Sequence, residues 1–185
     1  MRASHPSLLV AGRAMTDLRE SLVFQWADWL GERMAPAPTI PRATVERELR
    51  LLLDVLSQMV GPMRREVKTI WARTCEHYGR VGAARGLAAG EVVEELQYLR
   101  ELLIRNLASV LAPMRARQAM AIMLRLSNVL DQGIATAVVG YTDALVATLF
   151  SQNGVPSADA DLDPSEVDRQ LDSIEGEIAA VVKAR

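Results

Sequence analysis

The sequence contains one cysteine, two histidines and few aromatic residues, and these shortages exclude several classes of protein. Cys75 has no second cysteine with which to form an internal disulfide, so a disulfide-stapled secreted domain is excluded and a reducing compartment is expected. Cys75 also lies between Trp71 and Tyr78 in an apolar pattern with helical spacing. This position predicts a buried and unreactive thiol.

Long apolar runs are also missing from the chain. No uninterrupted apolar stretch approaches the roughly 20 residues that a membrane span requires, and the N-terminus lacks the features of a signal peptide. We therefore expect a cytoplasmic protein with no membrane partner. The 21 Lys and Arg residues stand against 23 Asp and Glu residues, a formal net charge of -2, so the charge does not favour binding to nucleic acid.

The groups that an enzyme needs are not recognisable either. There is no Ser-His-Asp order, no phosphate-binding glycine loop after a strand and no metal-ligand spacing. Glu91, Glu94 and Glu95 form a carboxylate cluster without a Glu-x-x-His partner, so we interpret it as the mostly solvated first turn of a helix. We expect a protein that is not an enzyme and that uses no metal and no cofactor.

The pattern that does fill the chain is the periodicity of amphipathic helices, which predicts an all-α bundle. Five main helices are expected over residues 16–34, 44–60, 63–85, 89–111 and 115–150, with Thr16 capping the first and Gly86 ending the third. An alternative is that the first helix already begins at Ser7. Residues 1–150 are expected to form one domain. Residues 151–163, rich in Ser, Gly, Asn, Pro and Asp, are expected to be a flexible linker to a short amphipathic helix over residues 164–185.

Two apolar patterns point to contacts beyond a single bundle face. The helix expected over 115–150 is apolar on more than one stripe, and Met120, Met123 and Val138 cannot all face one core, so we predict a homodimer interface on this helix or on the helix expected over 89–111. Leu171, Ile174 and Ile178 belong to a heptad-like seam in a segment too short to be stable alone. That segment is expected to dock on the domain, to pair with its dimer mate or to bind a partner.

Three stretches resemble one known family. The first is residues 86–100, in which the matching positions are Gly86, Leu87, Val92, Val93, Glu95, Leu99 and Arg100. The second is residues 126–141, which carry Asp131 and, ten residues later, Tyr141, and the third is the leucine-rich helix over 45–60. Together they resemble the N-terminal sensory domain of RsbT co-antagonists, the RsbR-type stressosome proteins, which is also found ahead of bacterial histidine kinases. Leu96 departs from the pattern, because the family usually has an aromatic residue there.

The resemblance implies a globin-like helical fold that dimerises, usually carries no haem and passes a signal to a downstream output domain. We therefore expect a non-catalytic bacterial sensory or signalling module, connected with stress response, that acts through protein-protein contacts with a partner in its pathway. No kinase, anti-sigma-antagonist or DNA-binding sequence follows Phe150. The output is accordingly expected to act in trans or through the segment over 164–185.

His77 supports two alternative hypotheses, because it is the only histidine within an expected helix. In a globin-type haem or small-molecule sensor it would be the axial ligand. In a histidine phosphotransfer protein it would be the phosphorylated residue, although the glycine that follows it stands one position too far along. A structural histidine is favoured over both.

Glu95 and Arg100 are five residues apart and so do not share a helical face. We therefore predict that Arg100 reaches a carboxylate on another helix, namely Asp131, in a buried pair that fixes the register of two helices.

Overall fold

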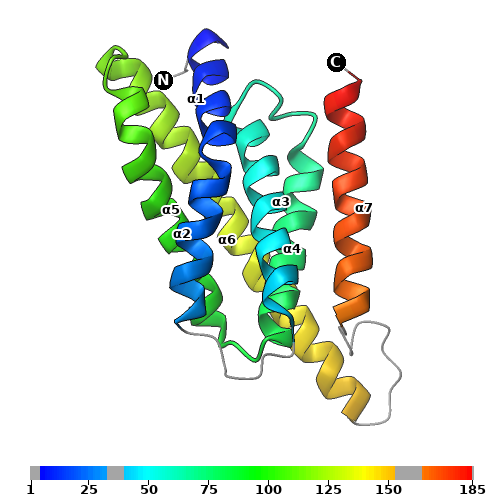
Figure 1. Ribbon diagram of the computed structural model, residues 1–185. Coiled ribbons are helices and arrows are strands. Elements are labelled where there is room, and N and C mark those ends of the chain that lie inside the picture. Colours follow the sequence, from blue (N-terminus) through cyan, green and yellow to red (C-terminus); the bar gives the residue numbers. More distant parts are fainter. Residues whose placement is uncertain (1–4, 33–39, 153–163, 185) are drawn as a thin grey trace.

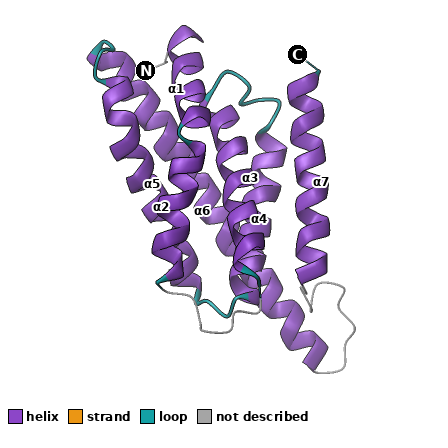
Figure 2. Ribbon diagram, viewed as in Figure 1, coloured by secondary structure: helices purple, strands orange, loops and turns teal. Residues whose placement is uncertain are grey.

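The computed structural model describes residues 5–32, 40–152 and 164–184, and its regular secondary structure within these ranges is all α-helix, joined by loops and turns (Figure 2). The predicted all-α class is confirmed. The described helices are α1 His5–Asp17, α2 Arg19–Gly31, α3 Arg42–Val60, α4 Lys68–Ala84, α5 Ala89–Leu111, α6 Ala116–Gln152 and α7 Pro164–Lys183 (Figure 1).

The first predicted helix is in fact two, α1 and α2, which follow one another with a break at Leu18. The expectation that Thr16 caps a helix is wrong, because its hydroxyl donates to the carbonyl oxygen of Gly12 at 3.1 Å, one turn back within α1. Backbone hydrogen bonds continue across the break from Leu18 to Ala14 and from Leu22 to Leu18. The helical pattern therefore extends to His5, well before the acidic turn that suggested a start.

The bundle is organised around α4 and α6, whose backbones touch. A Cβ atom built on Gly79 of α4 would lie 1.8 Å from the carbonyl oxygen of Ala137, and one on Gly140 of α6 would lie 2.1 Å from that of Glu76. Only glycine allows the two helices to approach so closely. The 37-residue helix α6 crosses the bundle obliquely, and its last turns project beyond the other helices (Figure 1).

The remaining helices build the core on these two. Trp26 of α2 and Tyr78 of α4 are fully buried, with ring centroids 5.9 Å apart. Helix α3 buries leucines on more than one stripe because α1, α2, α4 and α7 all contact it.

Gly86 ends α4 as predicted. It has a φ of 78°, in the left-handed region, and the amide of Leu87 donates to the carbonyl oxygen of Gly82 at 3.1 Å. This is the Schellman arrangement, which turns the chain directly into α5. At the start of α5 a Glu91 carboxylate oxygen accepts from the amide of Ala88 at 2.6 Å.

Helix α7 packs against α3 and α4 (Figure 1). It buries Val167, Leu171 and Ile174 completely, and Ile178 is partly buried against the same core. Of the three alternatives for residues 164–185, docking on the domain is the one that the structure shows. The linker expected over 151–163 lies outside the described residues from position 153 onward.

Among the described residues, one stretch, Ala116–Ser151 of α6, is long and apolar enough to cross a membrane by length and composition. The expectation from uninterrupted runs did not anticipate this, because small and weakly polar residues interrupt the apolar ones without lowering the mean hydropathy much. A central helix of a globular bundle meets the same criterion, and α6 packs extensively against α4, although only 33% of its apolar window is buried. The finding is therefore weak evidence for a membrane span.

Candidate functional site

A buried ion pair connects α4 to α5. The guanidinium of Arg85 donates to the two carboxylate oxygens of Glu95 at 2.6 and 3.0 Å, and the hydroxyl of Tyr78 donates to the same carboxylate at 2.5 Å. The side chains of Arg85 and Glu95 are only 5% and 4% exposed. The expectation that Glu95 is solvated is therefore wrong, because Arg85 and Tyr78 satisfy its charge inside the bundle.

The electrostatics of this triad keep both partners of Glu95 protonated. Burial and the neighbouring Glu95 charge raise the pKa of Tyr78 well above its usual value. Burial alone lowers the pKa of Arg85, but the hydrogen bonds and charge of Glu95 outweigh it and leave that pKa raised. At neutral pH the protonated phenol and the guanidinium therefore both donate to the Glu95 carboxyl group inside the bundle.

A second buried pair joins α3 to α4. Nδ1 of His77 lies 2.8 Å from a carboxylate oxygen of Glu48, and both side chains are almost fully buried. Neither Nε2 of His77 nor the other oxygen of Glu48 has a hydrogen-bond partner within the described part of the chain. Burial and the Glu48 charge raise the pKa of the Cys75 thiol, which is buried as predicted and stays protonated.

The surroundings of His77 bear on both hypotheses made for it. A cavity of about 340 Å³ between α4 and α7 is lined by His77 and by Arg73, Glu76, Arg80, Glu166, Arg169, Gln170, Ser173 and Ile174. This polar lining does not fit the flat apolar macrocycle of a haem. His77 is 5% exposed, so an incoming phosphotransfer partner would not reach its ring in this arrangement.

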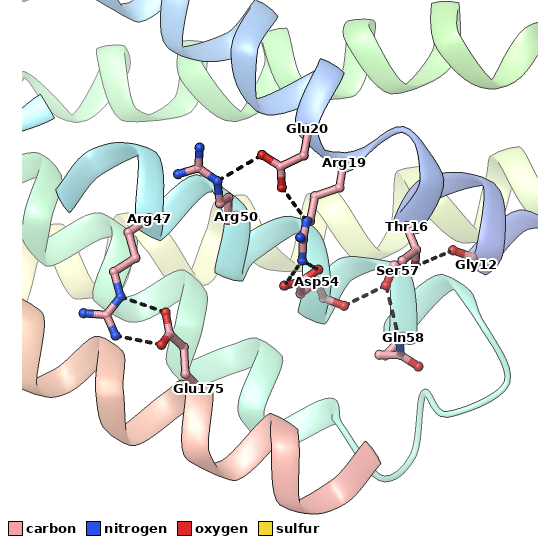
Figure 3. Close-up of polar contacts among 10 residues, drawn as sticks. All are labelled: Gly12, Thr16, Arg19, Glu20, Arg47, Arg50, Asp54, Ser57, Gln58 and Glu175. Atoms are coloured by element: carbon pink, nitrogen blue, oxygen red, sulfur yellow. Dashed lines mark hydrogen bonds and ion pairs between the residues drawn. The ribbon is translucent and has the colours of Figure 1, made fainter. Parts of the chain in front are cut away.

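Ion pairs connect α7 to α3 and α4. Arg47 of α3 faces three carboxylates of α7, at 3.6 Å from Asp168, 2.5 Å from Asp172 and 2.7 Å from Glu175. Figure 3 shows the contact with Glu175. The hydrogen bonds that Arg47 donates to the carboxylates of Glu175 and Asp172 raise its pKa. Arg73 of α4 forms a further ion pair with Glu177.

Beside this contact the second half of α7 borders an open groove of about 450 Å³. Its floor and walls include Leu51 of α3 and Ile178, Ala179 and Val182 of α7. The rim is polar: Arg19 pairs with Asp54 and Glu20, and Glu20 also accepts from Arg50 (Figure 3). An apolar floor with a charged rim suits an amphipathic occupant.

The family-like residues meet where α4, α5 and α6 converge. Leu99 is fully buried, and the Tyr141 hydroxyl donates at 2.8 Å to the carbonyl oxygen of Leu87, in the turn that Gly86 makes. Arg100 pairs with Asp131, so the predicted pairing is confirmed. The predicted burial of that pair is wrong, because the Asp131 side chain is 60% exposed.

The residues proposed for a dimer interface on α6 have different surroundings. Met120 is 56% exposed, whereas Met123 and Val138 are half-buried. Met120 and Met123 line an apolar groove of about 480 Å³ with Ile104, Ala108, Leu111, Ala112, Met114, Ala116 and Ala119. We call this the hairpin groove, because it lies where α5 turns into α6. Leu124, 51% exposed, follows on α6.

Glu48, Arg85 and Arg47 were not identified from the sequence. For Glu48 a signal exists, since it stands in phase with Val45 and Leu52 on the apolar face of its helix. For Arg85 and Arg47 there is none, because their partners lie on other helices.

No group of three or more His, Cys, Asp or Glu side chains in the described ranges could hold a metal ion. Comparisons of the chain with protein-family models, with curated proteins and with solved structures find no match.

Proposed function

We propose that this chain is a non-catalytic sensory or signalling module that dimerises through the hairpin groove and acts through protein-protein contacts. The observation that carries the proposal is the apolar surface made by Ile104, Met120 and Leu124, each at least two-fifths exposed, beside a groove lined by apolar side chains. Contiguous exposed apolar surface of this kind is typical of protein interaction sites.

The paired polar groups of the core support the non-catalytic part of the proposal. Glu95 is saturated by Arg85 and Tyr78, so it is not poised to exchange a proton with a substrate. The buried, protonated thiol of Cys75 supports a cytoplasmic location. The resemblance to RsbR-type sensory domains, with a globin-like arrangement of the helices before α7, is part of the same proposal, supported by the convergence of Gly86, Leu99 and Tyr141.

Light scattering of the purified chain at micromolar concentration tests the dimer. We expect a dimer mass for the native chain and a monomer mass for M120E/L124E, because two carboxylates would be desolvated in the interface. Phe24→Glu is the matched control, since Phe24 is exposed on α2, away from the hairpin groove. A monomer mass for the native chain would overturn the proposed interface.

A small-molecule sensor is the second candidate. It is favoured by the cavity that His77 lines and by the buried Nε2 atom of His77, which has no hydrogen-bond partner among the described residues. The polar lining of that cavity disfavours the haem form of this candidate, and an absorption spectrum of the protein purified after growth with added haem tests it. A Soret band that His77→Ala removes would establish it, and a spectrum without one would reject it.

A further inference from the structure

Helix α7 contacts the bundle along a narrow apolar seam. Val167, Leu171 and Ile174 are fully buried between α3 and α4, and they recur at spacings of four and three residues. This spacing places them on one face of the helix, as in a helix that docks into a groove. The surface beneath α7, which we call the α3/α4 face, is therefore shaped to receive an amphipathic helix.

The charge on the two sides of this contact is complementary. Within Pro164–Lys183, α7 carries five carboxylates and two basic side chains, whereas the α3/α4 face presents Arg47 and Arg73 to it. Arg47 alone faces carboxylates at three successive turns of α7, and two of them accept its hydrogen bonds. The α3/α4 face therefore favours a helix that has acidic residues beside its apolar seam.

The fit of α7 is incomplete in its second half. Ile178, Ala179 and Val182 border the 450 Å³ groove instead of filling it, and Val182 remains 47% exposed. Gly176 has open space around it and weakens the helix at its middle. A helix with the same charges and larger apolar side chains at these positions would fill the groove and bind more tightly than α7 does.

We propose that the α3/α4 face is a receptor for an acidic amphipathic helix of a partner protein, and that α7 occupies it in cis as a built-in competitor. This deepens the proposed function, on which it rests, by naming the partner class and the regulation. Because α7 is tethered to the face it occupies, it competes at an effective concentration on the order of millimolar. The partner helix binds when it outcompetes α7 or when α7 is released.

The probe is a fluorescein-labelled synthetic peptide with the sequence of residues 164–185, and the measurement is fluorescence anisotropy. The receptor is the full chain carrying L171D/I174D, which releases its own α7. We expect this chain to bind the peptide at least tenfold more tightly than the native chain does. Adding R47E should weaken that binding at least tenfold. Adding R105E, whose arginine pairs with Glu101 on α5, should leave it unchanged.

A second peptide tests the incomplete fit. The same peptide with Ala179→Leu should bind the released chain severalfold more tightly than the native peptide, because its added methyl groups enter the groove. Equal or weaker binding of the larger peptide would overturn the claim that a partner can outcompete α7.

Several results would overturn the receptor assignment. One is the absence of saturable binding to the released chain while circular dichroism shows a folded bundle. Another is equal binding by the native chain, which would mean that α7 does not compete. D172K/E175K, which repels Arg47 and leaves the apolar seam intact, serves as a second released chain if L171D/I174D does not fold. Unfolding of both would show that α7 is an integral core helix and would also reject the assignment.

Different experimental results would reject the proposed function and this inference. A native chain that is monomeric by light scattering rejects the dimer at the hairpin groove but does not affect peptide binding. A native dimer that dissociates on R47E and persists in M120E/L124E would identify the second copy's α7 as the occupant, and would overturn the partner assignment.

Discussion

Gly79 of α4 and Ala137 of α6 are in backbone contact: a methyl group at Gly79 would lie 1.8 Å from the Ala137 carbonyl oxygen and 2.9 Å from the amide nitrogen of Tyr141. Backbone cannot move aside as a flexible side chain can, so α4 and α6 would have to separate. The contact between these two helices, the most extensive in the bundle, therefore depends on the missing side chains of Gly79 and, on the facing helix, Gly140.

We accordingly predict that Gly79→Ala destabilises the protein by about 3 kcal/mol or more, the upper end of the range for overpacked cores. Gly90→Ala is the matched control, because Gly90 is also helical but has nothing within 4 Å of its Cβ position. That control should gain about 0.5 to 1 kcal/mol from helix propensity. Urea unfolding followed by circular dichroism measures both, and similar midpoints for the two variants would contradict the contact.

The sequence predicts the helices well and their close contacts poorly. Apolar periodicity identifies α3, α5, α6 and α7 to within two residues at each end, because each buries a face of fixed spacing. The expected start of α4 at residue 63 is wrong, because residues 61–67 form turns and the helix begins at Lys68. The close approach at Gly79 could not be predicted, since a glycine in a sequence does not show which backbone lies opposite it. The position of Ala137 relative to Gly79 is set by tertiary packing and is not encoded near either residue.

The candidate site shows the same division between local and long-range information. The pairing of Arg100 with Asp131 could be predicted because a family-like pattern placed both residues, but their exposure depends on how far α5 and α6 are rotated about their axes. Glu95 was expected in solvent because it stands among other glutamates. Its actual environment depends on Arg85, which only the α4–α5 turn brings within 2.6 Å.

The buried pair of Arg85 and Glu95 should be sensitive to loss of either partner. Arg85→Met leaves the carboxylate without its cation, and we expect a loss of about 3 to 5 kcal/mol, the range for removal of one partner from a buried ion pair. The double variant R85M/E95L should be more stable than R85M, because it removes the stranded charge. Thermal unfolding of the two variants measures this. If R85M/E95L is the less stable of the two, burial of the lone charge is not the dominant cost.

The pair of Arg100 and Asp131 provides the contrasting case, because its aspartate is largely in water. Arg100→Ala and Asp131→Asn should each cost at most about 1 kcal/mol, and the coupling in a double-mutant cycle should be a few tenths of that. High salt should reduce the coupling further. A cost of several kcal/mol for either single variant would mean that the pair is desolvated in the folded protein in solution.

Tyr78 should make the stability of the protein depend on pH in the alkaline range. Its pKa is raised in the folded state, first by burial and then by the charge of Glu95, whereas in the unfolded chain it has its usual value of about 10. Below pH 10 the phenol is protonated in both states, so its contribution to stability is fully present. Above pH 10 the unfolded chain releases the proton while the folded chain retains it, and this favours unfolding.

The variant that isolates this effect is Tyr78→Phe, which keeps the aromatic ring and removes the ionisable hydroxyl group. At neutral pH it should be less stable than the native protein by about 1.5 to 3 kcal/mol, because it loses a hydrogen bond to a charged group. As the pH rises past 10 that deficit should shrink by about 1.4 kcal/mol per pH unit, until the folded-state pKa is reached.

Cys75, whose pKa is also raised, contributes in the same direction in both proteins and cancels in the comparison. Unfolding by denaturant at a series of pH values from 8 to 11 measures the two stabilities. A deficit that stays constant across that series would show that the Tyr78 phenol ionises equally easily in the folded and unfolded chains, and that the triad with Glu95 and Arg85 does not form as described.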